Sequence, residues 1–187
     1  MRWTAIILLC GSLFLTRAAR ADDQSAPVTD FRAGTFDVAF DAVYGHSFIG
    51  SQSQLESATV GVGYYFVDNI SLSAEFSGFS VQQPVRDSII TSGDLLLRNH
   101  LYNRGPFSLF IDFGGGLTYA TQRVPASGTN FNFELETGVG FTYRLRDNTY
   151  LLAGARYLHF SNADMEGQAR NPSVNAFEGY VGVMFTF

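Results

Sequence analysis

Apolar and polar residues alternate with a period of two along most of the chain beyond residue 34. The segment that starts at Phe107 is typical: Phe107, Leu109 and Ile111 alternate with residues that include Ser108 and Asp112. This period is that of a β-strand with two unlike faces. The pattern predicts eight strands, at about 35–44, 55–66, 70–79, 89–102, 107–121, 132–143, 149–159 and 174–187.

The predicted connections alternate in length. Residues 67–69, 103–106 and 144–148 form short segments rich in Asn, Asp and Gly, whereas the other four connections are longer and polar, at 45–54, 80–88, 122–131 and 160–173. Outer-membrane barrels have this asymmetry, with short periplasmic turns and longer extracellular loops. A soluble lipocalin-like barrel has the same alternation with its apolar face inward, so the alternation alone does not separate the two classes.

The last strand favours the membrane barrel. Val181, Val183, Phe185 and Phe187 alternate up to a C-terminal Phe, which resembles the terminal signature that the barrel assembly machinery of bacterial outer membranes reads. We therefore expect an all-β fold, an eight-stranded antiparallel transmembrane up-and-down β-barrel in the bacterial cell outer membrane.

With the apolar face toward lipid, the charged face lines the lumen. An eight-stranded barrel has an interior that side chains just fill, so we expect a plug of paired charges instead of a pore. The residues placed there are Glu75, Asp94, Arg98, His100, Asp112, Glu134, Glu136, Arg156 and Glu178.

The first 21 residues have the pattern of a secretory signal peptide. Arg2 precedes an apolar run, and Ala19-Arg20-Ala21 offers a small-x-small cleavage site, so we expect cleavage after Ala21 and a barrel domain over 22–187. The only cysteine, Cys10, would leave with the leader. A net charge of −5 argues against a nucleic-acid partner, and the lack of a Cys/His cluster leaves no metal or cofactor expected.

Candidate chemistry lies at the end of the seventh predicted strand, where a His-x-Ser-Asn motif begins at His159. His159 and Ser161 are two positions apart, so on an extended backbone they share a face and the imidazole can reach the hydroxyl as a base reaches a nucleophile. Strand parity places both on the lipid-facing side at the extracellular end. The structural alternative is an interfacial His and a loop Ser without a catalytic role.

The residues His-Phe-Ser-Asn-Ala at 159–163, the polar loop, Arg-Asn-Pro-Ser-Val-Asn at 170–175 and the final aromatic strand together resemble the lipid A 3-O-deacylase (PagL) family of outer-membrane hydrolases. The resemblance implies hydrolysis of the ester at the 3-position of lipid A, with His159 as base, Ser161 as nucleophile and Asn162 as oxyanion donor. The family also has a Glu early in the last strand that orients the His. At that position this chain has Asn175.

Several carboxylates are alternatives for the missing acid. Glu178 has the opposite parity to Asn175, so we expect it to point inward and pair with Arg156. Asp164 and Glu166 in the last loop could reach the rim, as could His46, which the pattern places in the first long loop. The sequence does not choose among them.

The sequence thus predicts an outer-membrane lipid A 3-O-deacylase-like esterase that uses His159, Ser161 and Asn175, with lipid A of the outer leaflet as its partner. The alternative is a non-enzymatic small barrel of the OmpA or OmpX type with a structural or binding role. The sequence leaves open which acyl chain is removed, whether two copies form a homodimer and how the protein is regulated.

Overall fold

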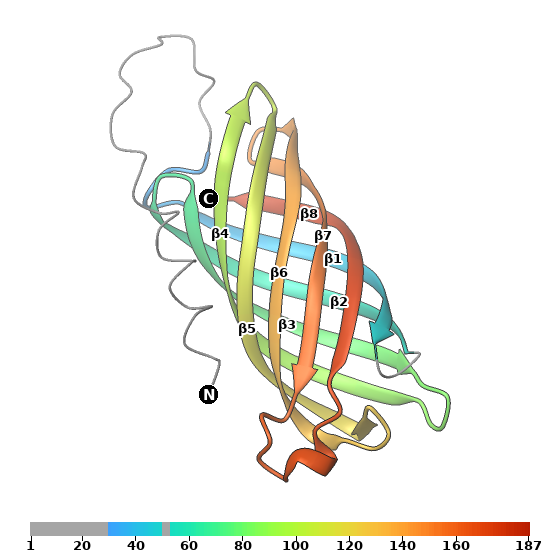
Figure 1. The fold of residues 1–187 in the computed structure, drawn as a ribbon. Helices are drawn as coiled ribbons and strands as arrows, with labels where there is room; N and C mark the ends of the chain where they lie inside the picture. Colours follow the sequence, from blue (N-terminus) through green and yellow to red (C-terminus); the bar gives the residue numbers. More distant parts are fainter. Residues whose placement is uncertain (1–29, 50–52) are drawn as a thin grey trace.

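The computed structural model describes residues 30–49 and 53–187, and Figure 1 shows them as a closed barrel of tilted strands. Each strand pairs antiparallel with its neighbours in sequence, and β1 closes the barrel against β8. The strands are β1 (Phe36–Ile49), β2 (Gln54–Val67), β3 (Ile70–Gln82), β4 (Ser88–Arg104), β5 (Phe107–Val124), β6 (Thr129–Arg146), β7 (Thr149–Ser161) and β8 (Val174–Thr186). A short 3₁₀ turn, η1 (Gln168–Arg170), lies between β7 and β8. The predicted fold class is confirmed, while the predicted signal peptide and its cleavage site lie outside the described residues.

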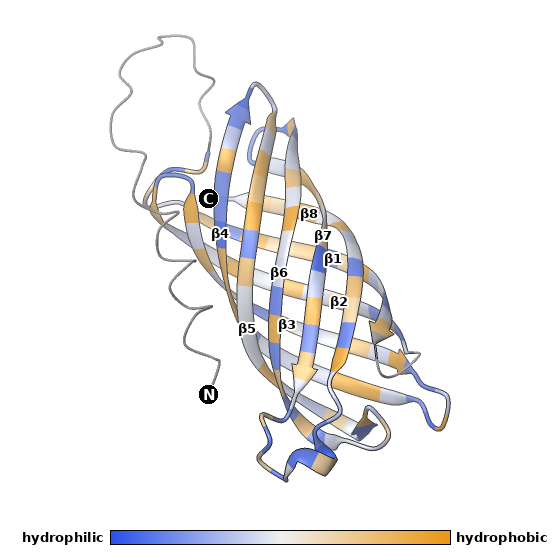
Figure 2. Ribbon diagram, in the orientation of Figure 1, coloured by the Kyte–Doolittle hydropathy of each residue, from blue (hydrophilic) through white to orange (hydrophobic). Residues whose placement is uncertain are grey.

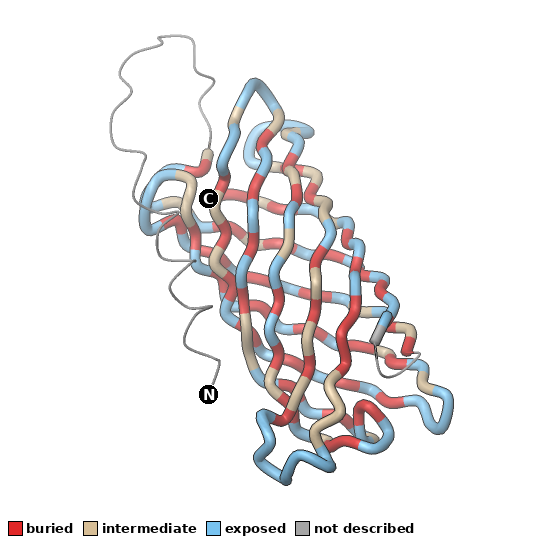
Figure 3. Tube along the Cα trace, in the orientation of Figure 1, coloured by how far each residue is buried: buried red, intermediate tan, exposed pale blue. Residues whose placement is uncertain are grey.

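The two faces of the barrel wall differ as the alternation predicted. On β5 the side chains of Leu109, Phe113 and Leu117 are 44%, 60% and 51% exposed, whereas Ser108 and Asp112 are buried. Figures 2 and 3 show the same alternation of polarity and burial along the other strands. An apolar exterior around a polar interior suits a barrel surrounded by lipid and is the inverse of a soluble barrel.

The strands extend further toward the extracellular side than their pattern predicts. The connections at 83–87 and 125–128 are therefore short, β1 continues to Ile49 and β2 begins at Gln54, whereas the β7–β8 connection at 162–173 is long. The prediction of four long loops was wrong because polar residues mark where the wall leaves the membrane, while strand pairing continues beyond that level. Among the described residues, no helix has the length and apolar character needed to cross a membrane.

The described segment before β1 packs against the periplasmic end of the barrel. Phe31 is buried there, and its ring stacks on His100 with 3.9 Å between ring centroids. The Phe31 carbonyl accepts a hydrogen bond from the Asn69 N–H at 2.7 Å, which ties the segment to the β2–β3 turn. Figure 1 shows the C-terminus at this same end of the barrel.

Charged side chains fill the middle of the lumen. Arg98 forms a two-pronged contact with Asp112, at 2.8 Å from Nε and 3.0 Å from Nη2. Arg156 pairs with Glu136 at 3.1 Å, and with Glu75 and Asp112 at 3.4 Å each. All nine residues predicted to face the lumen are buried, so their predicted placement is confirmed. The predicted pairing of charges is confirmed for Glu75, Asp112 and Glu136, which form ion pairs with Arg98 or Arg156.

Candidate active site

His159 lies near the extracellular end of β7, on the outward face of the barrel, and is half-buried. It stands in register opposite Asn175 on β8, and its Nδ1 lies 2.8 Å from the Asn175 Oδ1. An amide oxygen can only accept a hydrogen bond, so Nδ1 carries the hydrogen in this pair. In the neutral imidazole the other nitrogen, Nε2, then has a lone pair, and this tautomer is the one that a general base for Ser161 requires.

Asn175 has partners on both sides of its amide and is only 8% exposed. Its Oδ1 also accepts a hydrogen bond from the Tyr157 hydroxyl at 2.5 Å, and its Nδ2 donates to Ser173 Oγ at 3.3 Å. The prediction that Asn175 lies on the side of His159 is confirmed. Sequence reasoning missed Tyr157, because an outward-facing tyrosine near a barrel rim is the usual residue of an aromatic girdle.

Ser161 is the last residue of β7 and shares the outward parity of His159, as predicted. It stands in register opposite Phe133 on β6 and is half-buried. Within the part of the chain that the structure describes, no hydrogen bond joins Ser161 to His159. Catalytic hydrogen bonds of enzymes without substrate are often long and tighten when the substrate binds.

Asn162 is buried, and its amide groups organise the β7–β8 loop. Its Nδ2 donates to the Arg170 carbonyl at 2.8 Å and to Thr129 Oγ1 at 3.3 Å. Its backbone N–H donates to Asn171 Oδ1 at 2.9 Å. In this arrangement its donors are engaged, so the oxyanion role that the sequence predicts for Asn162 requires the loop to shift.

Among residues 30–49 and 53–187, no hydrogen bond or ion pair joins an alternative carboxylate to His159. Asp164 accepts a hydrogen bond from Asn171 at 2.8 Å, and Glu166 pairs with Arg170 at 2.9 Å on the exposed loop. Glu178 points inward, as predicted, and lies in register opposite Arg156.

The ion pair expected between Glu178 and Arg156 is not formed. Within the described segments the Glu178 Oε1 has no hydrogen-bond partner. The Arg156 guanidinium instead forms ion pairs with three acids on other strands, Glu75, Asp112 and Glu136.

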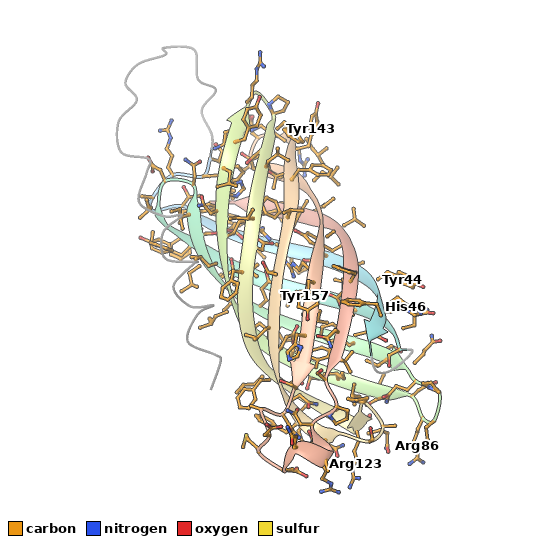
Figure 4. The ribbon with its side chains drawn as sticks, viewed as in Figure 1. Tyr44, His46, Arg86, Arg123, Tyr143 and Tyr157 are labelled. Atoms are coloured by element: carbon orange, nitrogen blue, oxygen red, sulfur yellow. The ribbon has the colours of Figure 1, made fainter. Side chains whose placement is uncertain are left out.

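The prediction that His46 lies in the first loop was wrong, because β1 continues to Ile49. The side chain of His46 is exposed on the outer wall, and its Nδ1 lies 2.7 Å from the Ser47 carbonyl oxygen. His46 stands opposite Phe177, so β8 separates its strand from that of His159. Figure 4 labels His46 and Tyr157 on these different strands.

Three aromatic rings form an apolar surface beside Asn175 on the outer wall. Phe48 and Phe177 stack with 4.7 Å between ring centroids, and Tyr157 lies 6.0 Å from Phe177 and 6.1 Å from Phe48. Phe177 is 64% exposed. Rings of this kind are typical of the level where a barrel wall meets the lipid headgroups.

The apolar exterior and the charged interior identify the chain as a small outer-membrane barrel. Its candidate site, the His159–Asn175 pair, lies on the outer wall, which faces lipid. The model of the lipid A 3-O-deacylase (PagL) family matches residues 87–184, which are more than half of the chain and include His159, Ser161 and Asn175. The chain therefore belongs to the lipid A 3-O-deacylase (PagL) family. This membership places it, in general terms, among lipid A deacylase-type hydrolases of the bacterial outer membrane.

Solved structures with this fold include neisserial surface protein A, at 18% identity and a TM-score of 0.62, with 82% of this chain and 96% of that chain covered. The outer-membrane enzyme PagL matches at 17% identity and a TM-score of 0.57, with 77% and 97% covered. OprG from Pseudomonas aeruginosa matches at 14% identity and a TM-score of 0.54, with 83% and 97% covered. At these identities the likenesses show the fold alone. Comparison with curated protein sequences gave no match.

Proposed function

We propose that this chain hydrolyses the ester-linked acyl chain at the 3-position of lipid A, with Ser161 as nucleophile and His159 as general base. The observation that carries the proposal is the hydrogen bond from His159 Nδ1 to Asn175 Oδ1 on the outer wall of the barrel. In the neutral ring it leaves the His159 Nε2 able to take a proton, and we expect this nitrogen to lie at the level of the outer leaflet, which contains lipid A. Family membership supports the substrate class.

The reaction follows the logic of a serine hydrolase. His159 Nε2 takes the proton of Ser161 Oγ while Oγ attacks the acyl carbonyl, and the proton then passes to the departing sugar oxygen. The ester bond to the sugar breaks and an acyl-serine forms. Water, deprotonated by the same Nε2, attacks the acyl-serine, which releases the fatty acid and restores Ser161.

Asn175 acts on this reaction through the imidazole. Its Oδ1 holds Nδ1–H and so fixes the ring, but an amide dipole stabilises the imidazolium less than a carboxylate charge does. For the oxyanion we propose Asn162, whose amide must first leave Arg170 or Thr129 as the substrate enters. The aromatic surface of Phe48, Tyr157 and Phe177 offers an apolar support for the acyl chain.

The test is mass spectrometry of lipid A from cells with and without the protein. We expect the cells that contain it to lose one hydroxyacyl chain from lipid A. Heat-modifiable gel migration must show that the barrel is folded in the same cells. An unchanged lipid A profile with a folded barrel contradicts the proposal and favours a structural or binding barrel.

His46→Gln is expected to leave deacylation within about twofold of the wild-type rate, because β8 separates His46 from the His159 site and surface substitutions away from a site have small effects. The rate of fatty-acid release from purified lipopolysaccharide measures this. A large loss in a folded His46→Gln barrel would move the catalytic base away from His159.

Two proposed partners concern assembly. Phe187 is 75% exposed, and its N–H donates to the Phe36 carbonyl at 2.9 Å, which holds the C-terminal residue at the β1–β8 seam. Its recognition by the barrel assembly machinery stays a prediction, as does a homodimer.

A further inference from the structure

We propose that Tyr157 is a positioning residue that orients the Asn175 amide and, through it, selects the tautomer of His159. This inference rests on the proposed function. Its observation is that one atom, Asn175 Oδ1, accepts hydrogen bonds from both the Tyr157 hydroxyl at 2.5 Å and His159 Nδ1 at 2.8 Å.

An asparagine at this position creates a problem that a glutamate does not have. A carboxylate offers an acceptor oxygen on either side, so it always demands a hydrogen on the imidazole nitrogen that faces it. An amide has an oxygen on one side and an NH₂ on the other, and the two ends have nearly the same shape. If Asn175 turned its Nδ2 toward His159, Nδ1 would become the acceptor and the hydrogen would move to Nε2. His159 could then no longer take the proton of Ser161.

Tyr157 favours the productive orientation because its hydroxyl donates to the same oxygen. Within the described residues, Asn175 Oδ1 is the acceptor of the Tyr157 O–H, and no second acceptor is present. In a flipped amide, Nδ2 would donate to the Tyr157 oxygen and the Tyr157 O–H would lose its acceptor, whereas the Ser173 hydroxyl can bond either end of the amide. At a half-buried position on a lipid-facing wall, an unpaired donor costs more than it does in water.

The ring of Tyr157 is held independently of its hydroxyl. It packs at the edge of the surface formed with Phe48 and Phe177, at 6.1 and 6.0 Å between ring centroids. Tyr157→Phe therefore removes the hydrogen bond and keeps the packing. Tyr119→Phe is the matched control, since Tyr119 is an outward-facing tyrosine on β5, 63% exposed and remote in the strand order from β8.

The first arm of the test measures hydrolysis of purified lipopolysaccharide. We expect Tyr157→Phe to lower kcat by roughly tenfold with little change in KM, because loss of this hydrogen bond lets the amide flip and moves the imidazole hydrogen mainly to Nε2. Tyr119→Phe should keep the wild-type kcat.

A double-mutant cycle separates positioning from a structural role. In an Asn175→Glu background the acceptor faces His159 in either orientation, so adding Tyr157→Phe should change kcat by no more than about twofold. A merely structural role predicts the same loss in both backgrounds, and that result overturns the proposal.

The second arm reads the tautomer directly, by ¹⁵N NMR of the His159 imidazole in lipid nanodiscs. We expect hydrogen on Nδ1 in the wild type, mainly on Nε2 in Tyr157→Phe, and on Nδ1 again in Tyr157→Phe/Asn175→Glu. An unchanged tautomer in Tyr157→Phe overturns the proposal. This arm does not depend on enzyme turnover. If the wild type fails to deacylate lipid A, the proposed function is wrong. The tautomer measurement still decides whether Tyr157 orients Asn175.

Discussion

Ser161→Ala and His159→Ala are each expected to lower lipid A deacylation by roughly 10³-fold or more, because nucleophile and base act as one unit. For the same reason, the double variant should be no slower than either single variant. The rate of fatty-acid release from purified lipopolysaccharide, compared at equal amounts of folded protein, measures the loss.

Both variants should still fold. The two side chains lie on the outer wall, outside the ion pairs of Arg98 and Arg156 that fill the lumen. Heat-modifiable gel migration is the control for folding. A folded variant of either kind with near-wild-type deacylation would remove that residue from the proposed mechanism.

Asn175→Glu is expected to raise deacylation, by about 10-fold or more. A carboxylate stabilises the imidazolium with a full charge, and exchanging Asp for Asn in the serine-protease triad costs about 10⁴-fold in turnover. The gain here should be smaller than that factor, because Tyr157 and Ser173 already hold the Asn175 amide in place. The same fatty-acid release assay measures it.

Glu178→Gln is the matched control for this gain, because Glu178 lies three positions further along β8 and faces the lumen. It should leave the deacylation rate close to that of the wild type. If Glu178→Gln removed activity while Asn175→Glu changed nothing, Glu178 would be the acid and the roles argued from the β8 register would be wrong.

Most of what the sequence could predict about the site came from strand parity, which is the face of the strand to which each side chain points. Adjacent side chains on an extended backbone point to opposite faces, so the choice of Asn175 over Glu178 as the partner of His159 needed only a count along the chain. The hydrogen bond between His159 and Asn175 agrees with that count.

Contacts between distant strands could not be predicted in this way. Arg156 forms ion pairs with Glu75 from β3 and Asp112 from β5. Its register neighbour Glu178 therefore lacks the expected ion pair. The hydrogen bond from Tyr157 to Asn175 was missed for a similar reason, because it depends on which donor reaches one oxygen across a strand pair. The predicted strand ends were wrong because the polarity of a residue indicates whether it contacts water, and does not indicate whether its backbone pairs with a neighbouring strand.

The most direct test of the account is to find the nucleophile. A phosphonate ester with a good leaving group is added to the folded barrel in lipid nanodiscs, and the modified peptide is identified by mass spectrometry. A nucleophilic serine displaces the leaving group and keeps the phosphonyl group on its oxygen. The account predicts an adduct on Ser161 that His159→Ala abolishes. An adduct on another residue, or no adduct on Ser161 in a barrel that deacylates lipid A, would contradict it.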